Sequence, residues 1–250
     1  MTMLRLRRVV MAGVLGLAMA SCQQSERPVR EPTPLDLTTV GTITGVVNFE
    51  GTAPAQTELQ VGSSAECAAL YDGPVLAGDV LVADGKVQNA IVYLSQGLGD
   101  RVFAVPETPV VIDQRDCLFV PRVAAAQVDQ PVRFLNGDML AHNVHGVPNE
   151  ARSWNFMLAV KGASREATIE REEPAIEITC DVHPWMKAYL GVFDHPYFAV
   201  TGADGRFSLP QVPPGDYTVT VWHERLGSSD AQATLAPNGA QDVTFFFRAE

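Results

Sequence analysis

Four side chains that bind soft metals gather in the middle of the chain. Cys180, His183 and Met186 lie in the stretch ITCDVHPWM, and His142 lies upstream in AHNVHG. One thiolate, two imidazoles and one thioether suit copper in both oxidation states, whereas zinc rarely binds a thioether. The short Cys-x2-His-x2-Met spacing lets one turn present three donors, and the fourth must come from a separate strand end. The pattern predicts a mononuclear copper site. The alternative is a group of packed core residues that binds no metal.

Composition excludes several other functions. The chain has 250 residues with 18 Lys and Arg against 29 Asp and Glu, a formal net charge of −11. This balance gives no basic surface for phosphate contacts, so nucleic-acid binding is excluded. Five His residues are too few for a multicopper oxidase. Because the sequence has no Ser/His/Asp grouping, phosphate-binding glycine loop or paired-carboxylate motif, we expect no enzyme activity.

The elements that must position these donors are predicted to be strands. From Gly41 onward, short runs rich in Val, Ile, Thr, Phe and Tyr alternate with the turn dipeptides Asp-Gly, Asn-Gly and Pro-Gly. No helical period persists, and only residues 63–70 suggest a short helical turn. The pattern predicts an all-β sandwich or barrel-like architecture that presents the donors at strand ends.

The donor motifs resemble those of the cupredoxins, the blue copper proteins, and among them the amicyanins and plastocyanins. The resemblance rests on His-Asn-Val-His and on Cys-x2-His-Pro-x-Met, and it covers residues 105–196. It implies a cupredoxin-like Greek-key β-sandwich with His142, Cys180 and His183 as equatorial ligands and Met186 as the axial ligand. It also implies one copper ion that cycles between Cu(I) and Cu(II).

Residues beside the ligands also have expected roles by this resemblance. Asn143 is expected to tie the two ligand loops together, through the side chain or the backbone of Asp181. Val182 stands where the amicyanins have Pro, so a backbone N–H that Pro lacks is available here. If this N–H points at the Cys180 sulfur, the hydrogen bond stabilises Cu(I) and raises the reduction potential.

Electrons are expected to enter and leave at the edge of one ligand. In cupredoxins the second His ligand presents a ring edge at an apolar surface patch. By the same resemblance His183, flanked by Pro184 and Trp185, presents its edge here, with Met139 or Leu140 in the same patch. The alternative for Trp185 is packing in the core.

The end of the chain resembles a second, smaller β module. Residues 197–250 contain Asp-Gly-Arg-Phe and Pro-Pro-Gly-Asp-Tyr-Thr-Val, similar to carboxypeptidase-regulatory or transthyretin-like β-sandwich modules. The start of residues 41–104, GTITGVVNFEGTAP, resembles the opening strand of such a module. Two arrangements stay open. Either this N-terminal segment pairs with the C-terminal module, or it supplies the first strands of the copper domain at 105–196.

Two further cysteines, Cys67 and Cys117, are predicted to form a disulfide. An even pair of cysteines in an exported protein is most simply explained in this way. The bond would close a loop of about 50 residues and attach the N-terminal segment to the copper domain. The alternative, a second metal site, lacks a His close to either cysteine in the sequence.

The N-terminal residues are typical of an export signal. Residues 1–21 have a basic start, an apolar run of 12 residues and small residues before Cys22. Twelve residues rise about 18 Å as a helix, which is too short for a bilayer core of about 30 Å. The ending Met-Ala-Ser-Cys resembles a bacterial lipobox, which implies cleavage before Cys22 and lipid on its sulfur. An ordinary secretory signal is the alternative. Residues 22–40, polar and Pro-containing, are expected to be a flexible tether.

We therefore expect an exported one-electron carrier, anchored by lipid on the periplasmic side of the cell envelope, at the outer membrane in a diderm cell. Without the three Arg of the signal, 15 Lys and Arg face 29 Asp and Glu, a net charge of −14. This charge favours a redox partner with a cationic face. One alternative is a periplasmic copper carrier or sensor that transfers the metal itself. Another is an envelope binding or structural module without a metal.

Overall fold

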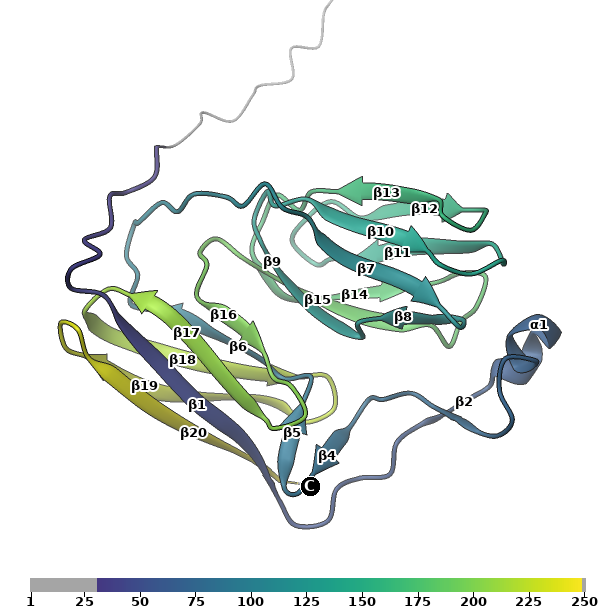
Figure 1. Ribbon diagram of the computed structural model, residues 1–250, viewed down its shortest axis with the longest axis horizontal. Coiled ribbons are helices and arrows are strands. Elements are labelled where there is room, and N and C mark those ends of the chain that lie inside the picture. Colours follow the sequence, from purple (N-terminus) through teal and green to yellow (C-terminus); the bar gives the residue numbers. More distant parts are fainter. Residues whose placement is uncertain (1–30, 249–250) are drawn as a thin grey trace, which may run out of the picture. The chain divides into compact units, whose positions relative to one another are not determined.

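The all-β architecture is confirmed by a computed structural model, which describes residues 31–248. Within that range the only helical elements are η1 (Val61–Ser63) and α1 (Ala65–Ala68), and α1 lies in the stretch expected to form a helical turn. Figure 1 shows how the strands are arranged. The strands are β1 (Gly41–Glu50), β2 (Glu58–Leu59), β3 (Val75–Leu76), β4 (Leu81–Ala83), β5 (Lys86–Gln88), β6 (Ile91–Gln96), β7 (Val110–Arg115), β8 (Leu118–Val120), β9 (Val123–Gln127), β10 (Val132–Asn136), β11 (His142–Val147), β12 (Trp154–Leu158), β13 (Ser164–Ala167), β14 (Glu173–Thr179), β15 (Lys187–Phe193), β16 (Phe198–Val200), β17 (Arg206–Val212), β18 (Gly215–His223), β19 (Gly227–Leu235) and β20 (Ala240–Arg248).

One sandwich, formed by β7 to β15, carries the predicted metal ligands, and we call it the donor sandwich. Its two sheets have the strand orders β13-β10-β7-β8 and β12-β11-β14-β15-β9. Along β10, buried residues alternate with partly exposed ones, as expected when one face of a strand lies on the core. The core between the sheets includes Ile112, Phe134, Val144, Ile176 and Leu190, all fully buried.

The second sandwich, which we call the flanking sandwich, combines segments that lie far apart in the sequence. Its sheets have the strand orders β17-β1-β5-β4, with β20 also beside β1, and β16-β6-β18-β19. β1 runs parallel to β20, so that Val47 lies opposite Phe245, and both side chains lie in one buried core. The strands β1, β4, β5 and β6 of the N-terminal segment therefore share both sheets with the C-terminal strands.

An apolar cluster and an ion pair join the two sandwiches. Ile91 of β6 packs with Phe193 of β15, and the rings of Tyr93 and Phe193 have centroids 4.5 Å apart. At the same junction Arg122, which precedes β9, donates two hydrogen bonds of 2.5 and 2.6 Å to the carboxylate of Glu224, which follows β18. Both side chains are largely buried, so the loss of either partner would leave a buried charge without its counter-charge.

A segment with little regular structure leaves the flanking sandwich after β1 and reaches the donor sandwich before it returns at β4. Its residues 57–76, which include β2, η1, α1 and β3, we call the cap segment. Figure 1 shows α1 beyond the ends of β7 and β8. The predicted disulfide is present and joins Cys67 of α1 to Cys117, which lies between β7 and β8.

The predicted signal at residues 1–21 and the predicted lipid site at Cys22 lie outside the described residues. In the described part of the predicted tether, Thr33 exchanges two hydrogen bonds with Val102, at 2.8 and 3.0 Å. This part of the predicted tether therefore contacts the folded part of the chain at Thr33. Among the residues that the structure describes, no helix is long and apolar enough to cross a membrane.

Candidate metal centre

Three of the four predicted donors meet at one end of the donor sandwich. β11 begins at His142 and β14 ends at Thr179, and the two strands pair antiparallel with His145 opposite Thr179. The start of β11 and the end of β14 therefore lie at the same edge of the sheet. The loop from Cys180 to Met186 leaves β14 at this edge, so Cys180 and His183 arrive beside His142.

Three donor atoms face a common point. Nδ1 of His142 lies 2.9 Å from Nδ1 of His183, and Sγ of Cys180 lies 3.9 Å from the same nitrogen of His183. One donor atom from each residue lies within 4.8 Å of the other two. Nitrogen and sulfur ligands bind a first-row metal at about 2.0 to 2.3 Å, so ligands of one ion stand about 3 to 4 Å apart. The three residues thus fit a single ion.

The donors are shielded from solvent. His142, Cys180 and Met186 are fully buried, and His183 is 6% exposed. The N–H of Met186 donates to the carbonyl of His183 at 2.9 Å, which closes the turn of the loop. Burial, and next the charge of His142, lowers the pKa of His183. The neutral imidazole, which is the form that binds metals, is therefore favoured.

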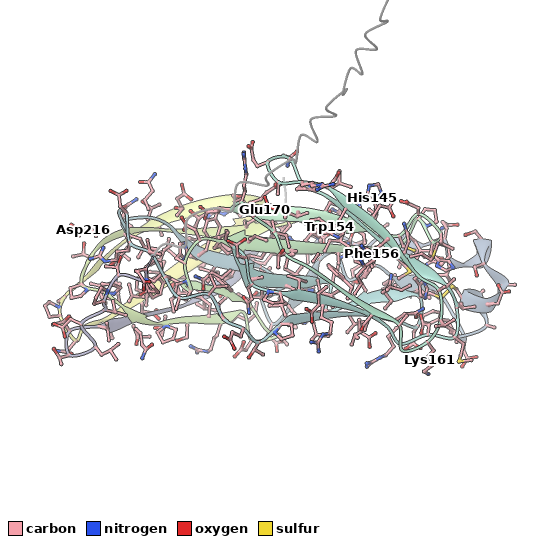
Figure 2. All side chains as sticks on the ribbon, turned by 90° about the horizontal axis from the view of Figure 1, so that it is seen from above. His145, Trp154, Phe156, Lys161, Glu170 and Asp216 are labelled. Carbon is pink, nitrogen blue, oxygen red and sulfur yellow. A yellow bond between two sulfur atoms is a disulfide. The ribbon has the colours of Figure 1, made fainter. Side chains whose placement is uncertain are left out.

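Asn143 ties β11 to the loop in the way expected from the resemblance. Its Nδ2 donates to Oδ2 of Asp181 at 2.9 Å, and its Oδ1 accepts the N–H of Asp181 at 2.5 Å. His145, labelled in Figure 2, lies at the surface with Nδ1 3.0 Å from Oδ1 of Asp181. Hydrogen bonds from His145, Asn155 and Asn143 hold the pKa of Asp181 below its usual range. The carboxylate of Asp181 is thus kept ionised as the link between strand and loop.

The hydrogen bond to the Cys180 sulfur comes from a different residue than predicted. The backbone N–H of Asn143 reaches Sγ of Cys180 at 3.4 Å. Among the hydrogen bonds of residues 31–248, none joins the N–H of Val182 to this sulfur, so the condition on which the effect of Val182 depended is not met. The reason is the strand pairing, because β11 runs beside the end of β14 and brings its second residue next to the first residue of the loop.

The edge of His183 is covered, whereas the resemblance placed it at the surface. The ring centroid of Trp185 lies 5.1 Å from that of His183, and Nε1 of Trp185 donates to the carbonyl of Cys117 at 3.1 Å. The sulfurs of Cys67 and Cys117 lie within 4.8 Å of a ring nitrogen of His183. The cap segment and its disulfide therefore lie against the ligand through which electrons were expected to pass.

The residues expected to form one electron-entry patch line two different grooves. Pro184 and Trp185 line a groove of about 350 Å³ together with residues of the cap segment. Met139, which is 81% exposed, and Leu140 line another groove of about 480 Å³ with Glu66 of α1. The structure does not bring Met139 and Leu140 to the groove that Trp185 lines.

Two buried residues near the site were missed by the sequence reasoning. Oδ2 of Asp138 lies 2.9 Å from Nε2 of His142, and Nε2 of Gln114 donates to the carbonyl of Asn143 at 2.9 Å. Asp138 stands four residues before His142, and this spacing was a signal that could have suggested a carboxylate partner for the imidazole. Gln114 lies on β7 in the opposite sheet, and no sequence pattern links it to the site.

Two other buried His residues, His195 and His223, form hydrogen bonds with the backbone. Nε2 of His195 lies 2.8 Å from the carbonyl of Leu94, and its Nδ1 accepts the N–H of Tyr197 at 3.1 Å. Nδ1 of His223 accepts the N–H of Arg225 at 3.2 Å. Hydrogen bonds to the backbone therefore occupy these buried imidazoles.

No protein-family model matches the chain, and no curated protein matches it in sequence. Three solved structures that resemble part of it come from copper proteins. A Cu-containing nitrite reductase from Thermus scotoductus SA-01 is 20% identical over 40% of this chain, with a TM-score of 0.33. A purple cupredoxin from Nitrosopumilus maritimus is 20% identical over 33% of this chain, with a TM-score of 0.29. A mutant of amicyanin with Cu(I) is 19% identical over 42% of this chain, with a TM-score of 0.31. The matched region spans 25% of the nitrite reductase chain and 98% of each of the other two.

Proposed function

We propose that this protein binds one copper ion through His142, Cys180, His183 and Met186 and carries single electrons. The observation that supports this function best is the convergence of two imidazole nitrogens and one cysteine sulfur within 4.8 Å in a buried site. A packing role gives no reason for two imidazoles to meet beside a thiol in a loop that also carries a thioether. The mixture of soft sulfur and imidazole donors favours copper over zinc, magnesium or calcium.

Copper supplies the one-electron couple between Cu(I) and Cu(II), and the task of the chain is to hold the ligands in place. Asn143 contributes to this by joining the loop at Asp181 and by donating its backbone N–H to Cys180. A hydrogen bond to the thiolate withdraws charge from sulfur and favours Cu(I). Because the donors are buried and tied to two strands, we expect little movement of the ligands when the electron is transferred.

Copper titration followed by visible spectroscopy tests this proposal. We expect one equivalent of Cu(II) to produce an intense thiolate-to-copper charge-transfer band that ascorbate bleaches and mild oxidants restore. Cys180→Ser should abolish the band, because the other two cysteines of the described chain are held in the disulfide.

Matched variants separate ligands from their neighbours. His142→Asn should abolish the band, whereas His145→Asn should retain it, because His145 pairs with Asp181 at the surface. Met186→Leu should shift the reduction potential, whereas Met157→Leu should leave it unchanged, because Met157 is exposed on β12.

The same titration distinguishes the alternative functions. A tight Cu(I) complex without the band, with rapid transfer of copper to a chelator, would identify a copper carrier instead of an electron carrier. Failure of the folded protein to take up stoichiometric copper would overturn the proposal and leave a binding or structural module.

We also propose that lipid on Cys22 anchors the exported protein to the envelope and that its redox partner has a cationic face. The sequence ending at Cys22 and the net charge of −14 after removal of the signal support these two points. Cys22→Ser should release the protein from the membrane fraction.

Oxidation of the reduced protein should be faster with a cationic metal complex than with an anionic one of equal potential, and added salt should reduce the difference. Equal rates at low salt would overturn the proposal for the partner.

A further inference from the structure

Asp138 contacts a predicted ligand from outside the metal site. It lies in the turn between β10 and β11 and is 8% exposed. Its Oδ2 lies 2.9 Å from Nε2 of His142 and also accepts the N–H of Cys117 at 2.9 Å. Its Oδ1 accepts the N–H of Asp116 at 2.8 Å. The carboxylate therefore receives hydrogen bonds from the ligand and from the turn that carries the disulfide.

The position of Asp138 is itself fixed by its surroundings. Its backbone N–H donates to Oδ1 of Asn136 at 2.9 Å. Nδ2 of Asn136 donates to the carbonyls of Leu140 and Leu158 at 2.7 and 2.8 Å. Asn136 is fully buried, and these three hydrogen bonds use its amide oxygen and both N–H groups of its side chain. They fix the turn that leads to His142.

The contact with a carboxylate determines which nitrogen of His142 can bind a metal. An ionised carboxylate has only acceptors, so Nε2 of His142 must carry the proton in this hydrogen bond. The lone pair of the neutral ring is then on Nδ1, the atom that faces Nδ1 of His183 at 2.9 Å. A carboxylate bonded to the remote nitrogen of a metal-binding imidazole fixes its tautomer and its orientation.

We propose that Asp138 is the positioning residue of the metal site and that it couples His142 to the disulfide-bonded turn at Asp116 and Cys117. The tautomer of His142 is a property of the protein without metal, and its coupling to copper affinity rests on the proposed function. The same turn also accepts the indole N–H of Trp185 at the carbonyl of Cys117. The turn at Asp116 and Cys117 therefore contacts one predicted His ligand, His142, through Asp138 and packs against the other, His183, through Trp185.

Asp138→Asn tests the proposal with little change in size. An amide offers one acceptor oxygen and one donor group where three N–H groups now meet two carboxylate oxygens. At least one N–H then faces the amide Nδ2, and the neutral oxygen that remains is a weaker acceptor than a carboxylate, so the side chain holds the ring of His142 less firmly. Loss of such a partner typically weakens metal binding 10- to 100-fold, so we expect a rise of about that size in the Cu(II) dissociation constant. Competition with a chelator of known affinity measures it.

Asp116→Asn is the matched control. Asp116 is exposed and contributes its backbone N–H, so this variant removes the same charge from the same turn but leaves the hydrogen bonds in place. We expect its Cu(II) affinity to stay within about twofold of the parent, because metal binding is weakened when the side chain that orients His142 is changed, and that side chain is Asp138. Equal weakening by both variants would show that charge alone acts, and it would overturn the proposal.

Nitrogen NMR of the metal-free protein gives a readout that needs neither copper nor a variant. With 15N-labelled histidine, we expect His142 to carry its proton on Nε2 in the parent protein and this preference to be weaker in Asp138→Asn. A proton on Nδ1 in the parent would overturn the proposal, even if the variant fails to fold. Failure of the parent to bind copper would refute the proposed function but leave this tautomer test intact.

Discussion

Reduction of the disulfide between Cys67 and Cys117 should weaken the donor sandwich by a predictable amount. The bond closes a loop of 50 residues, and the chain-entropy relation assigns such a loop about 4 kcal/mol at 25 °C. We therefore expect reduction to lower the free energy of unfolding by about 4 kcal/mol.

Urea unfolding of the metal-free protein, oxidised and phosphine-reduced, measures this change without altering the sequence. With an m-value of about 2 kcal/mol/M, the midpoint should fall by about 2 M urea. Trp154 and Trp185 pack on the core of the donor sandwich, whereas Trp222 packs at the junction. Fluorescence of a Trp222→Phe variant therefore reports the donor sandwich. A sample that is reduced and then reoxidised serves as the control.

The outcome separates two explanations of the cap segment. A loss near 4 kcal/mol means that the disulfide restrains the unfolded chain while the reduced cap segment stays folded against His183. A loss below about 1 kcal/mol would refute the reasoning, because the disulfide would then contribute no more than an ordinary contact.

Three further predictions concern the flanking sandwich and the loop. Gly45→Ala should cost about 3 kcal/mol in thermal unfolding, because its Cβ would lie 1.9 Å from the carbonyl oxygen of Val243 between two paired strands; unchanged stability would contradict the register of β1. Burial lowers the pKa of His223 to about 4, so the folded state holds the neutral ring while the unfolded chain binds a proton below about pH 6.5. Stability should therefore fall by about 3 kcal/mol between pH 6.5 and pH 4, and urea unfolding of His223→Gln should show a smaller pH dependence than the parent. Val182→Pro should leave the visible band and the reduction potential unchanged, because the N–H that reaches the thiol of the site belongs to Asn143; a lower potential would show that Val182 donates after all.

The strand-rich architecture follows from local sequence. Runs of β-branched and aromatic residues between turn dipeptides predict strands, because their side chains alternate between two faces. The burial pattern of β1, in which every second residue is buried, is an example. The partners of each strand do not follow from such patterns, because any strand with one apolar face can join either sheet. Residues 41–104 fit two arrangements by sequence, and the pairing of β1 with β20 and of β6 with β18 assigned β1, β4, β5 and β6 to the flanking sandwich.

The candidate site divides in the same way. The donor types can be read from the local sequence, since Cys180, His183 and Met186 stand within one short loop, and the disulfide between Cys67 and Cys117 was predicted as the simplest pairing. The surroundings of the donors, namely the carboxylate of Asp138 on His142 and the disulfide against His183, are seen in the folded chain alone. These contacts depend on the register of paired strands and on the path of the cap segment, which are set by packing between residues far apart in the chain. A short motif can specify which atoms could bind a metal, but the fold determines whether they meet, which nitrogen faces the ion and how far water is excluded.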